Sequence, residues 1–134
     1  DPQESIDFNG NTGPFIQYSY ARIRSIFRKA SDLGLDLNKQ DQFSVPSEKE
    51  KNLIRMIYRF PTVVEDAGSN LSPAIIANYV YDLAKEFNQF YHDCPILKEE
   101  NSEIRNLRLQ LADQTGKIIK QSMHLLGIDV PERM

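Results

Sequence analysis

Apolar residues recur along most of the chain at the three- and four-residue spacing that is typical of amphipathic helices. A first helix is predicted to begin near Pro14, because a residue without an N–H is well tolerated in a first turn. Gly34 is expected to end this helix. Its inward-facing positions are Ile16, Tyr20, Ile23, Phe27 and Ala30. Residues 1–13 and 35–46 are rich in polar and turn-forming residues, which predicts loops on both sides.

A second helix is predicted to begin after Ser47, because Ser47 and Glu50 have the spacing of a capping box. The apolar face of this helix consists of Leu53, Ile54, Ile57 and Tyr58. Pro61 interrupts the pattern and predicts a short third helix that extends through Val64 and Ala67.

Ser72 followed by Pro73 predicts the start of a fourth helix, which is expected to end between Asp93 and Pro95. Its broad apolar stripe consists of Ile76, Tyr79, Val80, Leu83, Phe87 and Phe90.

A fifth and longer helix is predicted between a cap at Asn101 or Ser102 and a stop at Gly127. Its apolar line consists of Ile104, Leu107, Leu111, Ile118, Ser122 and Leu125. No stretch of the sequence sustains the alternation of a strand. The sequence therefore predicts an all-α bundle of about five helices, forming a single domain over residues 1–134.

Composition narrows the class of protein. No apolar run approaches the roughly 18 residues that span a bilayer, so no membrane contact is expected. Cys94 is the only cysteine, which excludes an internal disulfide and favours a reducing, cytoplasmic setting. The net charge of −3 argues against broad, non-specific binding of nucleic acids, DNA included. It leaves room for a local basic face.

One exposed stripe of the first predicted helix carries Tyr18, Arg22, Ser25 and Lys29. An aromatic ring beside two cations suits an RNA strand, whose base stacks on the ring while its phosphates meet the cations. A solvated helix face with an incidental tyrosine gives the same pattern, and periodicity alone favours that simpler interpretation.

The end of the fourth predicted helix offers a second candidate. Tyr91 lies on the flank of the apolar stripe, so it is either a core residue or a ring whose hydroxyl reaches solvent. Asn88 and His92 lie further around the same helix as polar neighbours.

Catalytic and metal sites are not expected. The run His92, Asp93, Cys94 suggests a nucleophile or a metal ligand, but a zinc site needs about four ligands. The chain holds one cysteine and two histidines, and His124 reads as a boundary residue of the last helix. The Gly10 and Gly13 pair lacks the lysine of a phosphate-binding loop.

Four ordered segments carry a family resemblance. Residues 10–18 read GNTGPFIQY, residues 71–84 read LSPAIIANYVYDLA, residues 87–92 read FNQFYH, and residues 126–134 read LGIDVPERM. These segments resemble the signature segments of the C-terminal, anticodon-binding domain of arginyl-tRNA synthetases, a class I family. The resemblance covers nearly the whole chain.

The resemblance implies an all-helical domain that docks the anticodon loop of arginine tRNA. The parent enzyme attaches arginine to its tRNA, using ATP with magnesium in a catalytic domain of the same chain. That domain's His-x-Gly-His and Lys-Met-Ser-Lys signatures do not occur here, and the sequence does not begin with Met. We therefore expect a piece of a longer protein that is non-catalytic by itself, holds no cofactor, and is cytoplasmic and monomeric.

The resemblance also assigns site residues. Tyr18 and Arg22 are expected to face the anticodon loop, and Tyr91 and Met134 to enclose an anticodon base, typically the central cytosine. From their places on the two helix faces, and not from the resemblance, further RNA contacts are expected from Ser25, Lys29 and Asn88. Phe15 stands where many members have tyrosine, so one hydroxyl is missing.

A helical scaffold for protein–protein contacts, without RNA binding, is the alternative, and the mild acidity fits it. The two hypotheses differ in geometry. RNA recognition requires Tyr18, Arg22, Tyr91 and Met134 to converge in space.

Overall fold

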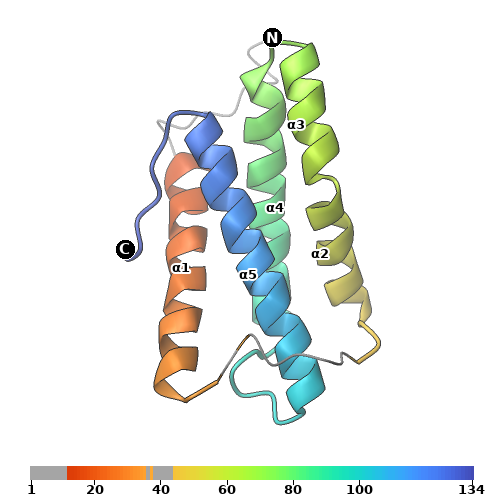
Figure 1. The fold of residues 1–134 in the computed structure, drawn as a ribbon, viewed down its shortest axis with the longest axis vertical. Helices are drawn as coiled ribbons and strands as arrows, with labels where there is room; N and C mark the ends of the chain where they lie inside the picture. Colours follow the sequence, from red (N-terminus) through yellow and green to blue (C-terminus); the bar gives the residue numbers. More distant parts are fainter. Residues whose placement is uncertain (1–11, 36, 38–43) are drawn as a thin grey trace.

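A computed structural model describes residues 12–35, 37 and 44–134. Its helices are α1 (Thr12–Asp32), α2 (Glu48–Tyr58), α3 (Phe60–Ser69), α4 (Pro73–Asp93) and α5 (Ser102–Leu125). Only Arg59 separates α2 from α3, and the two run end to end as one bent column (Figure 1). The described residues contain no strand, which confirms the all-α prediction. The five helices form the bundle, in which α2 and α3 share one column (Figure 1).

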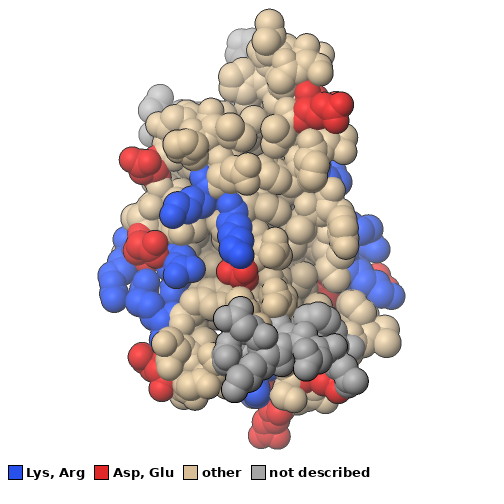
Figure 2. Space-filling view, viewed as in Figure 1, with Lys and Arg blue, Asp and Glu red and all other residues tan. Residues whose placement is uncertain are grey.

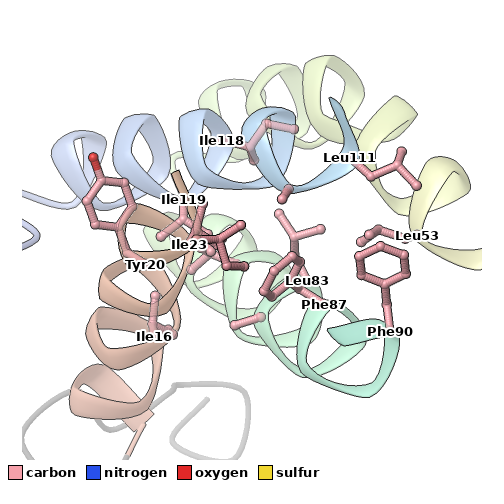
Figure 3. Close-up of a cluster of buried hydrophobic side chains, with 14 of the residues drawn as sticks. Ile16, Tyr20, Ile23, Leu53, Leu83, Phe87, Phe90, Leu111, Ile118 and Ile119 are labelled. Carbon is pink, nitrogen blue, oxygen red and sulfur yellow. The ribbon is translucent and has the colours of Figure 1, made fainter. Parts of the chain in front are cut away.

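Helix α4 lies at the centre of the bundle and packs against each of the other helices (Figure 1). Its predicted apolar stripe is buried throughout, from Ile76 to Phe90. Figure 3 shows Leu83, Phe87 and Phe90 of α4 pointing toward side chains of α1, α2 and α5. No helix in the described part of the chain is both long and apolar enough to cross a membrane.

Helices α1 and α5 approach each other closely at Gly116. A methyl group at this position would lie 3.0 Å from Cγ2 of Ile23, so the Ile23 side chain would have to move by a few tenths of an ångström to admit it. Tyr20 and Ile23 are buried at this contact, as predicted. Helix α1 begins at Thr12, two residues before the expected start at Pro14. Residues 1–11 lie outside the described part, as does most of the predicted 35–46 loop.

The predicted burial of two residues on the apolar faces, Tyr58 and Leu125, is wrong. Tyr58 is 80% exposed and Leu125 is 50% exposed. Tyr58 lies about 140° around α2 from the fully buried Leu53, so it points away from the bundle. Leu126, one residue beyond Leu125, takes the inward position and packs against the core.

The capping box at α2 is confirmed, and its acid is buried. Ser47 N–H donates to Oε1 of Glu50 at 2.7 Å, and Glu50 N–H donates to Oγ of Ser47 at 3.4 Å. Oε2 of Glu50 accepts Nε–H of Arg108 from α5 at 3.0 Å. Burial alone raises the pKa of Glu50, but the bonds from Ser47 and Arg108 outweigh it and hold that pKa below its usual value. A buried ion pair therefore joins α2 to α5.

The turn between α3 and α4 holds Leu71 at a φ of 51°. Ser72 N–H donates to the Ala67 carbonyl and Leu71 N–H to the Gly68 carbonyl, which is the hydrogen-bond pattern of a Schellman turn. Glycine occupies the equivalent left-handed position after α1, where Gly34 has a φ of 74°. Leu71 therefore adopts a left-handed backbone conformation that favours glycine.

Replacing Leu71 with glycine is expected to stabilise the bundle by about 0.5–1 kcal/mol. The left-handed conformation costs a non-glycine residue roughly 1–2 kcal/mol, and the added entropy of the unfolded chain offsets part of that gain. Leu71 is 89% exposed, so little packing is lost when its side chain is removed. Thermal unfolding should show a melting temperature about 2–4 °C higher. The matched control, Gly34→Ala, should lower it, and a lower melting temperature for Leu71→Gly would contradict the assignment of strain.

Candidate nucleic-acid interface

Helix α1 is the most basic element of the described chain. Between Thr12 and Ser31 it carries no acidic residue, and its basic residues are Arg22, Arg24, Arg28 and Lys29. Figure 2 shows Lys and Arg side chains gathered on the α1 side of the molecule. The net negative charge of the chain is therefore compatible with a local basic surface.

Arg22 lies between two tyrosine rings. Its guanidinium carbon is 5.1 Å from the ring centroid of Tyr18 and 4.5 Å from that of Tyr91. Nη1–H donates to Oδ1 of Asn88 at 2.6 Å, and Nη2–H donates to the Tyr18 hydroxyl at 3.3 Å. These contacts hold the cation in a fixed orientation between α1 and α4.

Asn88 is held in place by a chain of hydrogen bonds. Its Nδ2 group donates to Oγ of Ser19 at 2.8 Å and to the Ala84 carbonyl at 2.7 Å. The Ser19 hydroxyl donates to the Phe15 carbonyl at 2.9 Å. The two bonds donated by Nδ2 fix the orientation of the Asn88 side chain, and with it the position of Oδ1. Asn88 therefore orients Arg22, whose Nη1–H donates to this Oδ1.

Tyr91 is half-buried at the edge of the core. Its ring lies parallel to that of Phe87, with an interplanar angle of 4° and centroids 6.2 Å apart. The guanidinium of Arg22 lies over the same ring. The sequence left open whether Tyr91 is a core residue or a ring at the surface. In the structure Tyr91 packs against the core and also lines two surface pockets.

The 127–134 segment runs back along α1 (Figure 1). Gly127, with a φ of 78°, reverses the chain after α5, and Ile128 N–H donates to the Met123 carbonyl at 2.8 Å. Gln17 Nε2 donates to the Asp129 carbonyl at 3.2 Å. Further along, Glu132 contacts α1 through both its side chain and its backbone. The segment is thereby placed against the basic helix.

Arg24 and Arg28 make the contacts to Glu132. Nε of Arg24 lies 3.0 Å from Oε2 of Glu132, and Nη1–H of Arg28 donates to the Glu132 carbonyl at 3.0 Å. Burial raises the pKa of Tyr20, and the Glu132 carboxylate raises it further while Arg24 opposes the shift. Glu132 is thus held at the surface of α1, where it lines a hollow together with Tyr20.

A pocket of about 450 Å³ opens where α1, the end of α4 and the 127–134 segment meet. Its lining residues are Tyr18, Ala21, Arg22, Ser25, Ile26, Arg28, Lys29, Tyr91, Arg133 and Met134. Tyr18, Arg22, Tyr91 and Met134 therefore converge, as RNA recognition requires. The expected additional residues Ser25 and Lys29 line the same pocket.

Asn88 lies outside this pocket. It lines an adjoining hollow of about 630 Å³, which shares Arg22 and Tyr91 as walls. The other lining residues of this hollow are Phe15, Lys85, Gln89, His92 and Asp93. Sequence reasoning missed Arg28 and Arg133 as pocket residues. The signal for Arg133 was its position next to Met134, whereas Arg28 lies outside the stripe through Arg22 and Lys29.

The remaining candidates do not form a second site. Cys94 is buried, and this burial raises the pKa of its thiol, which leaves little of the reactive thiolate at neutral pH. His92 and His124 are exposed on the surface. Within the described ranges, no group of three or more His, Cys, Asp and Glu side chains is arranged to hold a metal ion.

Comparison with known proteins gives a family and several relatives. Residues 16–134 match the model of the DALR anticodon binding domain. The chain is 60% identical over 134 residues to the arginine–tRNA ligase of Parabacteroides distasonis. The alignment covers 99% of this chain and 22% of that protein. The arginine–tRNA ligase of Phocaeicola vulgatus is 57% identical over the same shares.

Solved structures agree in fold. An arginyl-tRNA synthetase from Plasmodium falciparum has a TM-score of 0.80 and 35% identity, covering 96% of this chain and 22% of that one. The Thermus thermophilus arginyl-tRNA synthetase has a TM-score of 0.78 and 30% identity, covering 98% of this chain and 23% of that one. The chain thus spans about a fifth of the length of the relatives that it matches.

Proposed function

Because the chain belongs to the DALR anticodon-binding domain family, we propose that it binds the anticodon loop of arginine tRNA, as one domain of an arginine–tRNA ligase. The observation that carries this proposal is the pocket at which Tyr18, Arg22, Tyr91 and Met134 meet. These residues come from α1, α4 and the 127–134 segment, so only the folded chain assembles them.

The chemistry of the pocket fits a single unstacked nucleotide. Planar groups of Tyr18, Arg22 and Tyr91 offer stacking surfaces, and the Met134 thioether adapts to the edge of a base. The guanidinium of Arg22 already lies over the Tyr91 ring. A base that enters therefore stacks on the guanidinium plane or takes its place on the ring.

The rim of the pocket supplies the cations. Arg28, Lys29 and Arg133 line it, and no acidic residue does. Phosphates on either side of an inserted base would meet these side chains, which supports RNA binding despite the chain's net charge of −3. Specificity for one base requires the pocket, because phosphate contacts carry no sequence information.

The rest of the proposal concerns the longer protein. The matched relatives are about five times as long, and they are named arginine–tRNA ligases. We infer that arginine, ATP and magnesium bind to a catalytic domain of the same chain, while this domain positions the tRNA. A monomer in the cytoplasm is part of the same proposal, and the free, buried Cys94 thiol fits a reducing compartment.

A binding titration tests the proposed function. The chain is titrated with a labelled anticodon stem–loop of arginine tRNA at low salt, and then with the same stem–loop carrying a changed central anticodon base. We expect the altered base to weaken binding about 10-fold or more, because each wrong base typically costs 1–3 kcal/mol. Equal affinity for the two stem–loops would contradict recognition of that base.

A further inference from the structure

Glu132 is bound by two arginines, Arg24 and Arg28, that lie one turn apart on α1. Arg24 pairs with its carboxylate at 3.0 Å, and Arg28 donates to its backbone carbonyl at 3.0 Å. Side chain and backbone are therefore held at the same residue. A contact of both kinds fixes the path of the chain as well as the position of the carboxylate.

The two contacts of Glu132 limit the position of Met134. Two residues of extended chain span at most about 7 Å, so Met134 stays within that reach of the anchored residue. Arg133, between them, lines the same pocket as Met134. The anchor therefore places both side chains at the wall of the pocket.

Neither Arg24 nor Glu132 lines the pocket itself. Their side chains are 38% and 61% exposed, and an ion pair this exposed contributes little to folding. The consequence of the pair is geometric, because it fixes the far end of a segment that Gln17 and Arg28 also hold against α1.

We propose that Arg24 is a positioning residue of the anticodon pocket: its ion pair with Glu132 holds the 127–134 segment so that Met134 forms the pocket wall. This inference rests on the proposed function for its RNA readout, but not for its structural one. Arg28 supports the same placement through the Glu132 backbone. The competing role for Arg24 is a direct contact to an RNA phosphate.

Charge reversal separates the two roles. The variants are Arg24→Glu, Glu132→Arg and the double variant that swaps the two charges, with Arg24→Gln as a milder change. The first readout, without RNA, is the ε-methyl NMR signal of Met134, assigned by its loss in Met134→Leu. The second is the ratio of affinities for the native and the altered stem–loop, in which non-specific charge effects cancel.

Met134 is 67% exposed even in the intact chain, so the methyl signal reports on its neighbours in the pocket. We expect each single reversal to shift this signal, because Met134 leaves the pocket wall. The affinity ratio should fall about 5-fold, and the melting temperature should stay nearly unchanged. The swapped pair should restore both the methyl signal and the ratio. A direct phosphate contact by Arg24 does not explain restoration of the ratio, because the swapped pair has a carboxylate at position 24.

Two results would overturn the proposal. One is a methyl signal that is unchanged in both single variants, which would mean that the pair does not place Met134. The other is a swapped pair that recovers the methyl signal but binds as poorly as Arg24→Glu, which would assign Arg24 to the RNA. If the unaltered chain shows no base discrimination, the proposed function fails, and the methyl signal still decides the placement.

Discussion

Arg108→Met is expected to destabilise the bundle by about 3–5 kcal/mol, because it leaves the carboxylate of Glu50 buried without its cation. The Glu50 side chain is 2% exposed and that of Arg108 is 12% exposed. Arg108 also donates to the Pro95 carbonyl at 2.6 Å and to Glu99 at 3.2 Å. One guanidinium thus ties α5 to α2 and to the segment before α5. Chemical denaturation measures the loss.

A double variant provides the control. Glu50→Gln keeps an acceptor for the capping box but removes the buried charge. Combined with Arg108→Met, it should recover a large part of the lost stability, since no unpaired ion remains. If the double variant were as unstable as the sum of the two single variants, the ion pair would not be the cause.

The same pair predicts a pH dependence with a definite sign. The pKa of Glu50 is lowered in the folded state, so the ionised form stabilises folding. This contribution is fully present above the unfolded value of about 4.3 and is lost as the pH falls through the lower folded value. The stability difference between the unaltered chain and Arg108→Met should therefore be constant near pH 7 and shrink in acid.

Arg22→Ala is expected to weaken binding of the anticodon stem–loop about 10- to 100-fold, or roughly 1.4–2.7 kcal/mol. The change removes the cation between the rings of Tyr18 and Tyr91. It also removes the planar group on which a base would stack. The affinity of Arg22→Lys should lie between that of the unaltered chain and that of Arg22→Ala. Lysine keeps the charge but loses the planar group and its several hydrogen bonds.

A matched control lies on the far side of the bundle. Arg55 is an exposed arginine of α2, a helix that packs against α4 and α5. Arg55→Ala changes the net charge by the same amount and should leave affinity nearly unchanged. Equal losses for Arg22→Ala and Arg55→Ala would show that only overall charge matters. Melting curves for both variants exclude unfolding as the cause.

Much of the fold was predictable because local spacing decides it. The α4 stripe from Ile76 to Phe90 repeats at helical spacing, and every predicted position is buried. The Ser47 capping box is a local signal too, and it marks the start of α2. Spacing does not reveal that Glu50, an apparent surface acid, is buried by the distant Arg108. It also does not reveal that Leu71 adopts a left-handed conformation where glycine is usual.

The candidate site was predictable only in part. Tyr18 and Arg22 share a stripe that periodicity identifies, but the same periodicity suited a solvated face. The contacts that place the 127–134 segment join residues 104 to 112 positions apart, and no local pattern encodes them. The family resemblance supplied Tyr91 and Met134, and the structure added Arg24, Arg28 and Glu132 as the residues that bring them together.

The most direct test of the account is a single NMR titration. The chain carries isotope labels in its tyrosine rings and methionine methyl groups, and the anticodon stem–loop of arginine tRNA is added stepwise. The account predicts that signals of Tyr18, Tyr91 and Met134 shift together along one binding curve. Tyr58, which is 80% exposed on α2, serves as the internal control and should stay unchanged. Shifts at Tyr58 with none at those three residues would contradict the proposed interface.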